Sequence, residues 1–138
     1  MIKMRLWHQK LIPHLPRQQL LGQHRECCAL RGAGWGRRHA VVNYVFTHSP
    51  DRLVAYHALI MDEMIRRGYN PDKTWYNRNW RGNALLEQDG WCDYNECFRL
   101  WENAKEGCMI YPEHNDAYLQ ECLDNLADKG IIIDKEKL

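Results

Sequence analysis

The chain has 138 residues, a formal net charge of +1 and 45% hydrophobic residues, enough for a single domain with a buried core. No apolar run reaches the length of a membrane span, and the first residues, MIKMRLWHQK, lack the apolar segment of a signal peptide. Composition therefore argues against a membrane or secreted protein and predicts a cytoplasmic one with no membrane partner.

The small net charge hides a strong asymmetry along the chain. Residues 1–81 hold 14 Lys+Arg and five Asp+Glu, whereas residues 82–138 hold five Lys+Arg and 13 Asp+Glu. Such a division favours a basic face for a polyanion such as nucleic acid, carried by the first half. Mutual attraction of the two halves in the folded chain is the alternative, and both can hold in one molecule.

Hydrophobic spacing predicts an arm followed by helices in the first half of the chain. Residues 1–12 carry no helix pattern and read as an ordered N-terminal arm. Residues 16–30 follow with an apolar stripe at spacings of three and four, which predicts an amphipathic helix. Residues 39–46 are ambiguous between a strand and a short buried helix, and the lack of a second strand nearby favours the helix. Residues 49–68 form the clearest helix, from the Ser-Pro-Asp start to the glycine at its end.

The second half predicts a long loop and two further helices. Residues 70–90 read as a loop rich in tryptophan, residues 93–104 as a short helix and residues 112–130 as a strong final helix. The expected fold is therefore all-α: one compact domain over residues 1–138, with four to five helices, long structured loops and an N-terminal arm.

Cysteine and histidine spacing predicts no metal site. The six cysteines form no CxxC pair, so they read as reduced thiols in a protein without a secretory segment. The histidines show no HExxH or similar spacing, so neither a metal nor another cofactor is expected. His57 on the apolar face of the 49–68 helix and His114 near the last helix are expected to be structural.

One carboxylate is unusual for its surroundings. Up to His48 the chain has eight Lys+Arg and a single acid, Glu26, which follows Arg25. A carboxylate close to a polyphosphate site weakens binding by repulsion, so its presence suggests a role in stabilising a cation or moving a proton. A solvated Arg-Glu pair on a helix surface is the simpler alternative.

Several basic residues are candidates for contacts with a nucleic-acid backbone. The glycine-rich stretch RGAGWGRR lacks the GxxxxGK[ST] pattern of a nucleotide-binding loop, so we interpret it as a loop that lays arginines along DNA, or simply as a tight turn. The tryptophans and arginines of residues 75–81 can stack bases, or the tryptophans can fill the core. The expected phosphate or sugar contacts are Arg5, His8, His24, Arg31, Arg37, Arg38 and His39.

The order of five segments resembles the pyrimidine-dimer DNA glycosylase family. These segments are MRLWHQKLI, RQQLLGQHRECCAL, RRHAVVNYVF, MIRRGYN and YPEHNDAYLQECLDNL. HREC matches the family's Arg-Glu pair, RRH matches its Gly-His region, and RRGYN matches its Lys-Arg-Gly-Phe-Asn. The resemblance covers most of the chain and implies damaged double-stranded DNA as the partner.

The resemblance also implies a mechanism. Such enzymes attack the sugar C1′ with the α-amine of the chain, form a Schiff base and then nick the strand by elimination. Glu26 matches the family's glutamate, which stabilises cationic character at the sugar and assists proton transfer, with Arg25 beside it. The family arm begins at the methionine matched by Met4, so the amine belongs to Met4, or to Met1 in the longer form.

The resemblance implies a DNA glycosylase with AP-lyase activity, an enzyme of DNA repair found at the nucleoid when bound. Two alternatives stay open: a nucleic-acid-binding module without catalysis, and a protein-interaction domain that uses the acidic half.

Overall fold

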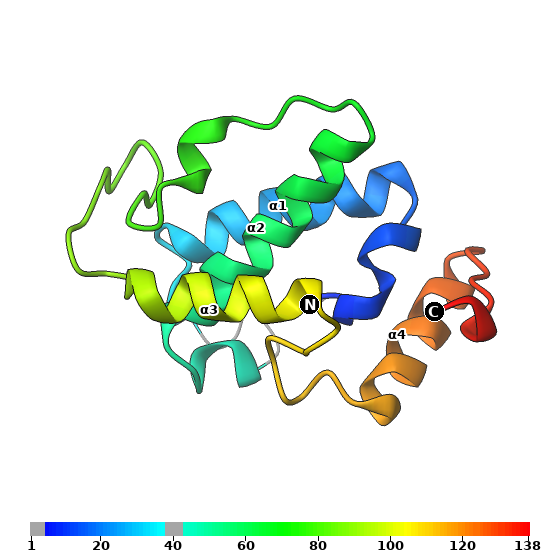
Figure 1. Cartoon of the computed structure of the whole chain (residues 1–138). Coiled ribbons are helices and arrows are strands. Elements are labelled where there is room, and N and C mark those ends of the chain that lie inside the picture. The colour runs from blue at the N-terminus through cyan, green and yellow to red at the C-terminus, as the bar shows by residue number, and fades with distance from the viewer. Residues whose placement is uncertain (1–4, 38–42) are drawn as a thin grey trace.

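The computed structural model describes residues 5–37 and 43–138, and it confirms the all-α prediction (Figure 1). Within these residues no β-strand forms, and Trp80 and Glu87 make an isolated antiparallel bridge. The α-helices are α1 (Arg17–Arg31), α2 (Pro50–Arg66), α3 (Tyr94–Lys105) and α4 (Asp116–Asp128). Short 3₁₀ helices are η1 (Gln9–His14), η2 (Asn43–Phe46), η3 (Lys73–Tyr76) and η4 (Lys135–Lys137).

Capping groups explain where the helices begin. The Asp93 side chain accepts from the Glu96 amide at the start of α3, and Asn115 accepts from Tyr118 at the start of α4. Ser49 occupies the N-cap of α2, but its hydroxyl donates to the Asp51 carboxylate instead of capping the helix. The helix α4 begins later than the predicted residue 112 because the preceding turn buries a histidine in the core.

The core forms around α2, which packs against both α1 and α3 (Figure 1). Burial confirms the two predicted stripes: Leu20, Gln23, Cys27 and Leu30 on α1, and Leu53, Tyr56, His57, Ile60, Met61 and Met64 on α2. None of the helices in the described residues combines the length and the apolar character needed to cross a membrane.

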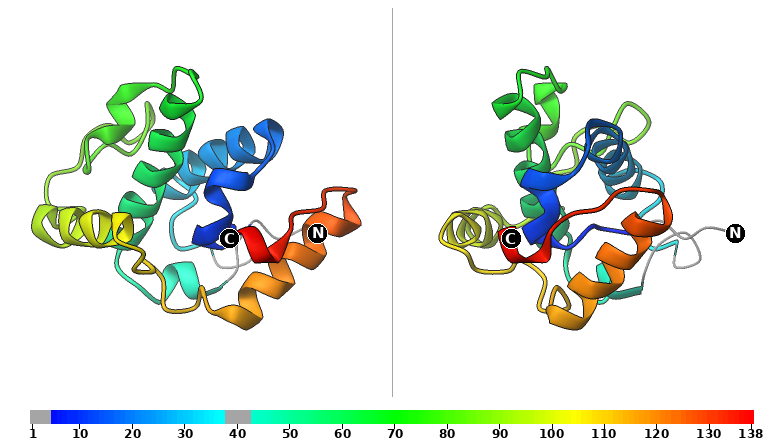
Figure 2. Two further views of the ribbon diagram at one scale, coloured as in Figure 1. Left: turned by 45° about the vertical axis from the view of Figure 1, so that its right-hand side comes forward. Right: turned by 90° about the vertical axis from the view of Figure 1, so that its right-hand side faces the viewer.

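The described part of the N-terminal arm, residues 5–12, is mostly buried, and its second part is helical. Residues 9–12 were expected to be irregular, but they belong to η1 because His8 caps its start by accepting from the Lys10 amide. The Tyr56 hydroxyl on α2 bonds the Trp7 carbonyl oxygen at 2.7 Å, and the Tyr118 hydroxyl on α4 bonds the Leu6 carbonyl oxygen at 2.7 Å. The arm therefore runs between α2 and α4 (Figure 2).

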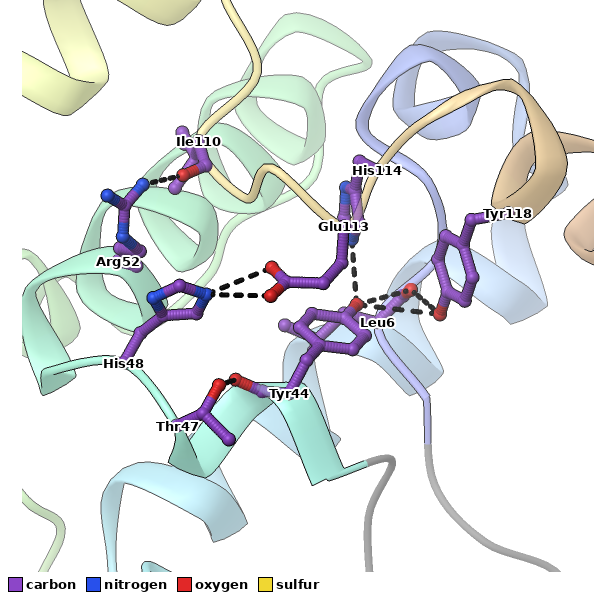
Figure 3. A network of polar contacts seen from close by, with 9 residues as sticks. All are labelled: Leu6, Tyr44, Thr47, His48, Arg52, Ile110, Glu113, His114 and Tyr118. Carbon is purple, nitrogen blue, oxygen red and sulfur yellow. Dashed lines mark hydrogen bonds and ion pairs between the residues drawn. The ribbon is translucent and has the colours of Figure 1, made fainter.

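Buried hydrogen bonds hold the arm against the C-terminal half (Figure 3). The Gln9 amide donates to Nδ1 of His114 at 3.1 Å, so Nε2 of His114 carries the ring proton and donates to the Tyr44 hydroxyl at 2.7 Å. Desolvation is the main cause that lowers the pKa of His114 to about 3, and the nearby His8 ring is the second. His114 is thus a neutral structural residue, as its place before the last helix predicts.

Candidate active site

Glu26 lies on α1 and faces the N-terminal arm. Its Oε2 accepts a hydrogen bond from Nε2 of Gln23 at 3.0 Å, one helical turn earlier. Burial raises the pKa of Glu26 to about 6, against the opposing effect of the positive charges of Arg25 and Lys129. The carboxylate is therefore partly shielded from water but still ionised at neutral pH.

Gln23 connects this carboxylate to the arm. Its Nε2 donates both to Glu26 and to the Arg5 carbonyl oxygen, at 2.9 Å, while its Oε1 accepts from the Trp7 amide at 2.6 Å. The Tyr56 hydroxyl on α2 is 2.9 Å from the same Oε1. The single proton of this hydroxyl is shared between Oε1 and the Trp7 carbonyl oxygen, so the amide makes three full hydrogen bonds, and rotating it by 180° would set its oxygen against the carboxylate. The side chain has one orientation.

The path of the arm brings Arg5 to the amide group that bonds Glu26. Arg5 is the residue after Met4, and its carbonyl oxygen and the Glu26 carboxylate share the Gln23 amide group. Arg5 itself lies near the Trp7 ring, 5.8 Å from its centroid, and its Nη1 is 3.6 Å from the Glu121 carboxylate on α4. Met4, proposed from the sequence to carry the reactive amine, lies outside the described residues.

Three residues of this site were not predicted from the sequence as functional. Gln23 and Tyr56 appeared only as members of apolar stripes, yet a glutamine on a buried stripe must find hydrogen-bond partners, and that could have identified it. Lys129 follows α4 and lies with its ammonium 5.9 Å from the Trp7 ring centroid. Nothing in the sequence relates it to Glu26, because it belongs to the acidic half.

Arg31 was expected to contact phosphate, and the structure corrects this. Its side chain is 0% exposed at the end of α1. It donates to the carbonyl oxygens of Trp75, Asn77 and Trp80 and to Nδ1 of His57, at 2.8 to 3.1 Å. Desolvation lowers the pKa of Arg31 to about 10, which still leaves it charged at neutral pH. Arg31 therefore holds the tryptophan-rich loop on α1 and cannot reach DNA.

His8 is also removed from the expected DNA contacts. It is 1% exposed and stacks on His114, with ring centroids 5.2 Å apart. His24 is half-buried, and its Nδ1 lies 2.8 Å from Nε2 of the buried His57. Because His24 is only half-buried, its expected DNA contact stays a prediction.

The exposed arginines remain compatible with DNA contacts. Arg25 and Arg37 are exposed, and Arg37 donates from Nε to the Ala33 carbonyl oxygen at 3.0 Å. The glycine-rich stretch forms a tight turn here, since a Cβ at Gly34 would approach the Ala29 carbonyl oxygen to 2.7 Å. Arg38 and His39, also expected to meet phosphate, lie outside the described residues.

The loop of residues 75–81 is held on the end of α1. Trp75 lies near His57 and Arg31, with its ring centroid 5.1 Å from the guanidinium carbon. Arg81 donates to the carbonyl oxygens of Arg31 and Gly32, which end α1. Trp75 and Trp80 are half-buried and lie outside the core cluster, so core filling by these tryptophans and base stacking both stay predictions.

A family model described as pyrimidine dimer DNA glycosylase matches residues 4–77. The chain belongs to this family. The match spans more than half of the chain and includes the arm, α1, α2 and η3, and it begins at Met4. The residues around Glu26 described above all fall inside it except Lys129 and Glu121. No curated protein and no solved structure matches the chain.

Proposed function

We propose that this family member excises a damaged base, a pyrimidine dimer, from double-stranded DNA and then nicks the strand as an AP lyase. The observation that carries this proposal is the shared Gln23 amide, which bonds Arg5 of the arm and Glu26 of α1 at the same time. This contact keeps the residue that follows Met4 beside the one acid of a basic segment.

The nucleophile is the α-amine of Met4, or of Met1 in the longer form. An α-amine has an unperturbed pKa of about 8, so a usable fraction is neutral at pH 7, unlike the amine of an ordinary lysine. Consecutive Cα atoms are about 3.8 Å apart. The α-amine of a chain that begins at Met4 is therefore only one residue from Arg5, whose carbonyl oxygen Gln23 binds. A match that starts at residue 4 agrees with this choice.

Glu26 stabilises the cations of the reaction. When C1′ of the sugar loses its base, positive charge develops on the sugar and then on the iminium that the amine forms. A fixed carboxylate beside these species lowers their free energy most when water is partly excluded. The half-buried position of Glu26 and the donation from Gln23, which keeps the carboxylate oriented, support this role.

Arg25, Arg37 and Arg5 bind the DNA backbone in this proposal, and Lys129 adds a cation near Glu26. Arg38 and His39 keep the same proposed role from the sequence. Extruding a nucleotide from the duplex costs a few kcal/mol, which contacts of this kind offset.

Borohydride trapping on abasic-site DNA tests the proposal. The chain with a free N-terminus at Met4 should give a covalent adduct, while Glu26→Gln and a chemically blocked N-terminus should reduce adduct formation by about 100-fold or more. Glu102→Gln is the matched control, because Glu102 is exposed on α3, and it should trap as well as the parent.

The same experiment separates the other candidate functions. If neither the form starting at Met4 nor that starting at Met1 yields an adduct, the Schiff-base mechanism is wrong. DNA binding without an adduct would then indicate a binding module, and no DNA affinity at low salt would indicate a protein-interaction domain. Mass spectrometry of the natural N-terminus decides which methionine carries the amine.

A further inference from the structure

A cluster of nitrogen and sulfur ligand atoms lies on the side of α1 away from Glu26. His24 and Cys28 are four residues apart on α1, and His57 comes from α2. One ligand atom from each residue lies within 4.8 Å of the others. His24 and Cys28 are each two positions from Glu26, which is roughly 200° around a helix, so this cluster is separate from the candidate active site.

We propose that His24, Cys28 and His57 form a binding site for one divalent transition-metal ion of the zinc class. This proposal goes beyond the glycosylase activity and does not depend on it. It also revises the expectation from the sequence, which predicted no metal.

The three residues are close enough for a tetrahedral site, but His24 faces Cys28 with Nε2 and His57 with Nδ1, so its ring must turn to offer one nitrogen to an ion. With metal–nitrogen bonds of about 2.0–2.1 Å and a metal–sulfur bond of about 2.3 Å, nitrogen and sulfur ligands are roughly 3.6 Å apart. Sγ of Cys28 is 3.8 Å from Nε2 of His24 and 3.9 Å from Nε2 of His57. Nδ1 of His24 and Nε2 of His57 are 2.8 Å apart, a hydrogen bond that must open by about 0.5 Å to admit an ion.

Arg31 fixes the ring of His57 in the metal-free fold. Its Nη1 donates to Nδ1 of His57 at 2.9 Å, so Nδ1 is the acceptor there and the protonated Nε2 points to His24 and Cys28. A neutral imidazole that binds an ion through Nε2 carries its proton on Nδ1, so metal binding requires the contact with Arg31 to open. The His57 proton then moves from Nε2 to Nδ1, and the thiol proton of Cys28 passes to solvent.

The surroundings allow entry and indicate the class of ion. His57 is buried, but His24 and Cys28 are only half-buried and reach the surface. The Asp72 carboxylate acts electrostatically on both of these residues and adds negative charge near the cluster, against the positive charges of Arg25 and Arg31. Imidazole and thiolate ligands select zinc, cobalt, nickel or copper over magnesium and calcium.

Cobalt titration of the full chain after chelator treatment tests the site. Co²⁺ should bind with one equivalent per chain and give visible d–d bands, a near-ultraviolet thiolate-to-cobalt charge-transfer band and a raised Tm. The charge-transfer band should vanish in Cys28→Ser and remain in Cys108→Ser, since Cys108 is an exposed free thiol outside the cluster. His24→Gln should weaken cobalt binding by about 100-fold or more.

Three results would overturn the proposal. They are no stoichiometric cobalt binding by the folded parent, a charge-transfer band that survives in Cys28→Ser, and unchanged affinity in His24→Gln that is folded by circular dichroism. The Glu26→Gln variant separates the two sites, because it should lose the DNA adduct and keep the cobalt spectrum.

Discussion

The two sides of α1 use polar residues in opposite ways. Toward the arm, the neutral Gln23 bonds the main chain of Arg5 and Trp7 and the half-buried Glu26 carboxylate. Toward the tryptophan-rich loop, the charged Arg31 is fully buried and pairs with carbonyl oxygens. Residue type is therefore a poor guide to function in a basic segment. Exposure and partners decide which arginine can meet DNA and which one holds the fold.

Replacing Arg31 should have the largest effect on stability. Arg31→Met keeps much of the volume but leaves three carbonyl oxygens and Nδ1 of His57 without their donor. We expect a loss of about 3–5 kcal/mol in the free energy of unfolding, measured by urea denaturation. Arg25→Met, on the same helix but exposed, is the control and should change stability by less than about 0.5 kcal/mol. Equal effects would remove the distinction between the two arginines.

Replacing Gln23 should affect stability and catalysis together. Gln23→Leu leaves the Arg5 carbonyl oxygen and the Trp7 amide unpaired in the core and releases Glu26. We expect a loss of about 2–4 kcal/mol and a fall in borohydride trapping that exceeds the loss of folded protein. Gln18→Leu, on the exposed side of α1, should change neither. Normal trapping by folded Gln23→Leu would mean that this amide does not position the site.

Acidification should weaken the network that holds the arm to the C-terminal half. The folded-state pKa of His114 is about 3, below its unfolded value of about 6.5, so the unfolded chain binds a proton that the folded chain excludes. Stability is therefore complete above about pH 6.5 and is lost progressively as pH falls toward 3. The loss attributable to His114 is up to about 5 kcal/mol, at 1.4 kcal/mol per pKa unit.

Chemical denaturation at several pH values measures this effect. His114→Gln, which cannot titrate, should flatten the dependence, whereas exposed His14→Gln should leave it unchanged. A pH dependence that is the same in His114→Gln and in the parent would contradict the assignment.

Replacing an exposed arginine should change DNA binding without a loss of stability, and this is the smallest of the expected effects. Arg25→Ala should lower the slope of log affinity against log salt by about 0.9, the value for one phosphate contact on duplex DNA. Fluorescence anisotropy with an abasic duplex measures this slope. Arg99→Ala, exposed on the acidic α3 and paired with Glu96, should not change it. An unchanged slope in Arg25→Ala would exclude Arg25 from the proposed DNA face.

Much of the fold was predictable because helix formation depends on local spacing and end signals. The apolar stripes of α1 and α2 and the stop at Gly68 follow directly from the sequence. The 3₁₀ helix in the arm was missed, since its six residues, about two turns, are too few for a periodic pattern. The later start of α4 was missed because it depends on the burial of His114.

The candidate site was only half predictable. Glu26 was singled out by charge contrast, and family resemblance supplied the amine. Gln23 and Lys129 were not predicted as site residues, since their relation to Glu26 depends on how the arm and the end of α4 come together. Arg31 and His8 were placed on the DNA side because a sequence shows charge but not exposure.

The sequence by itself determined the all-α class, the long helices and the single acid of a basic segment. These properties are local or compositional, so the order of residues suffices for them. Only the tertiary structure decided which polar groups meet. It joined Arg5, Gln23 and Glu26 on one side of α1, and His24, Cys28 and His57 on the other. Such contacts arise when α1 packs against the arm and α2, and burial then forces each polar group to find a partner.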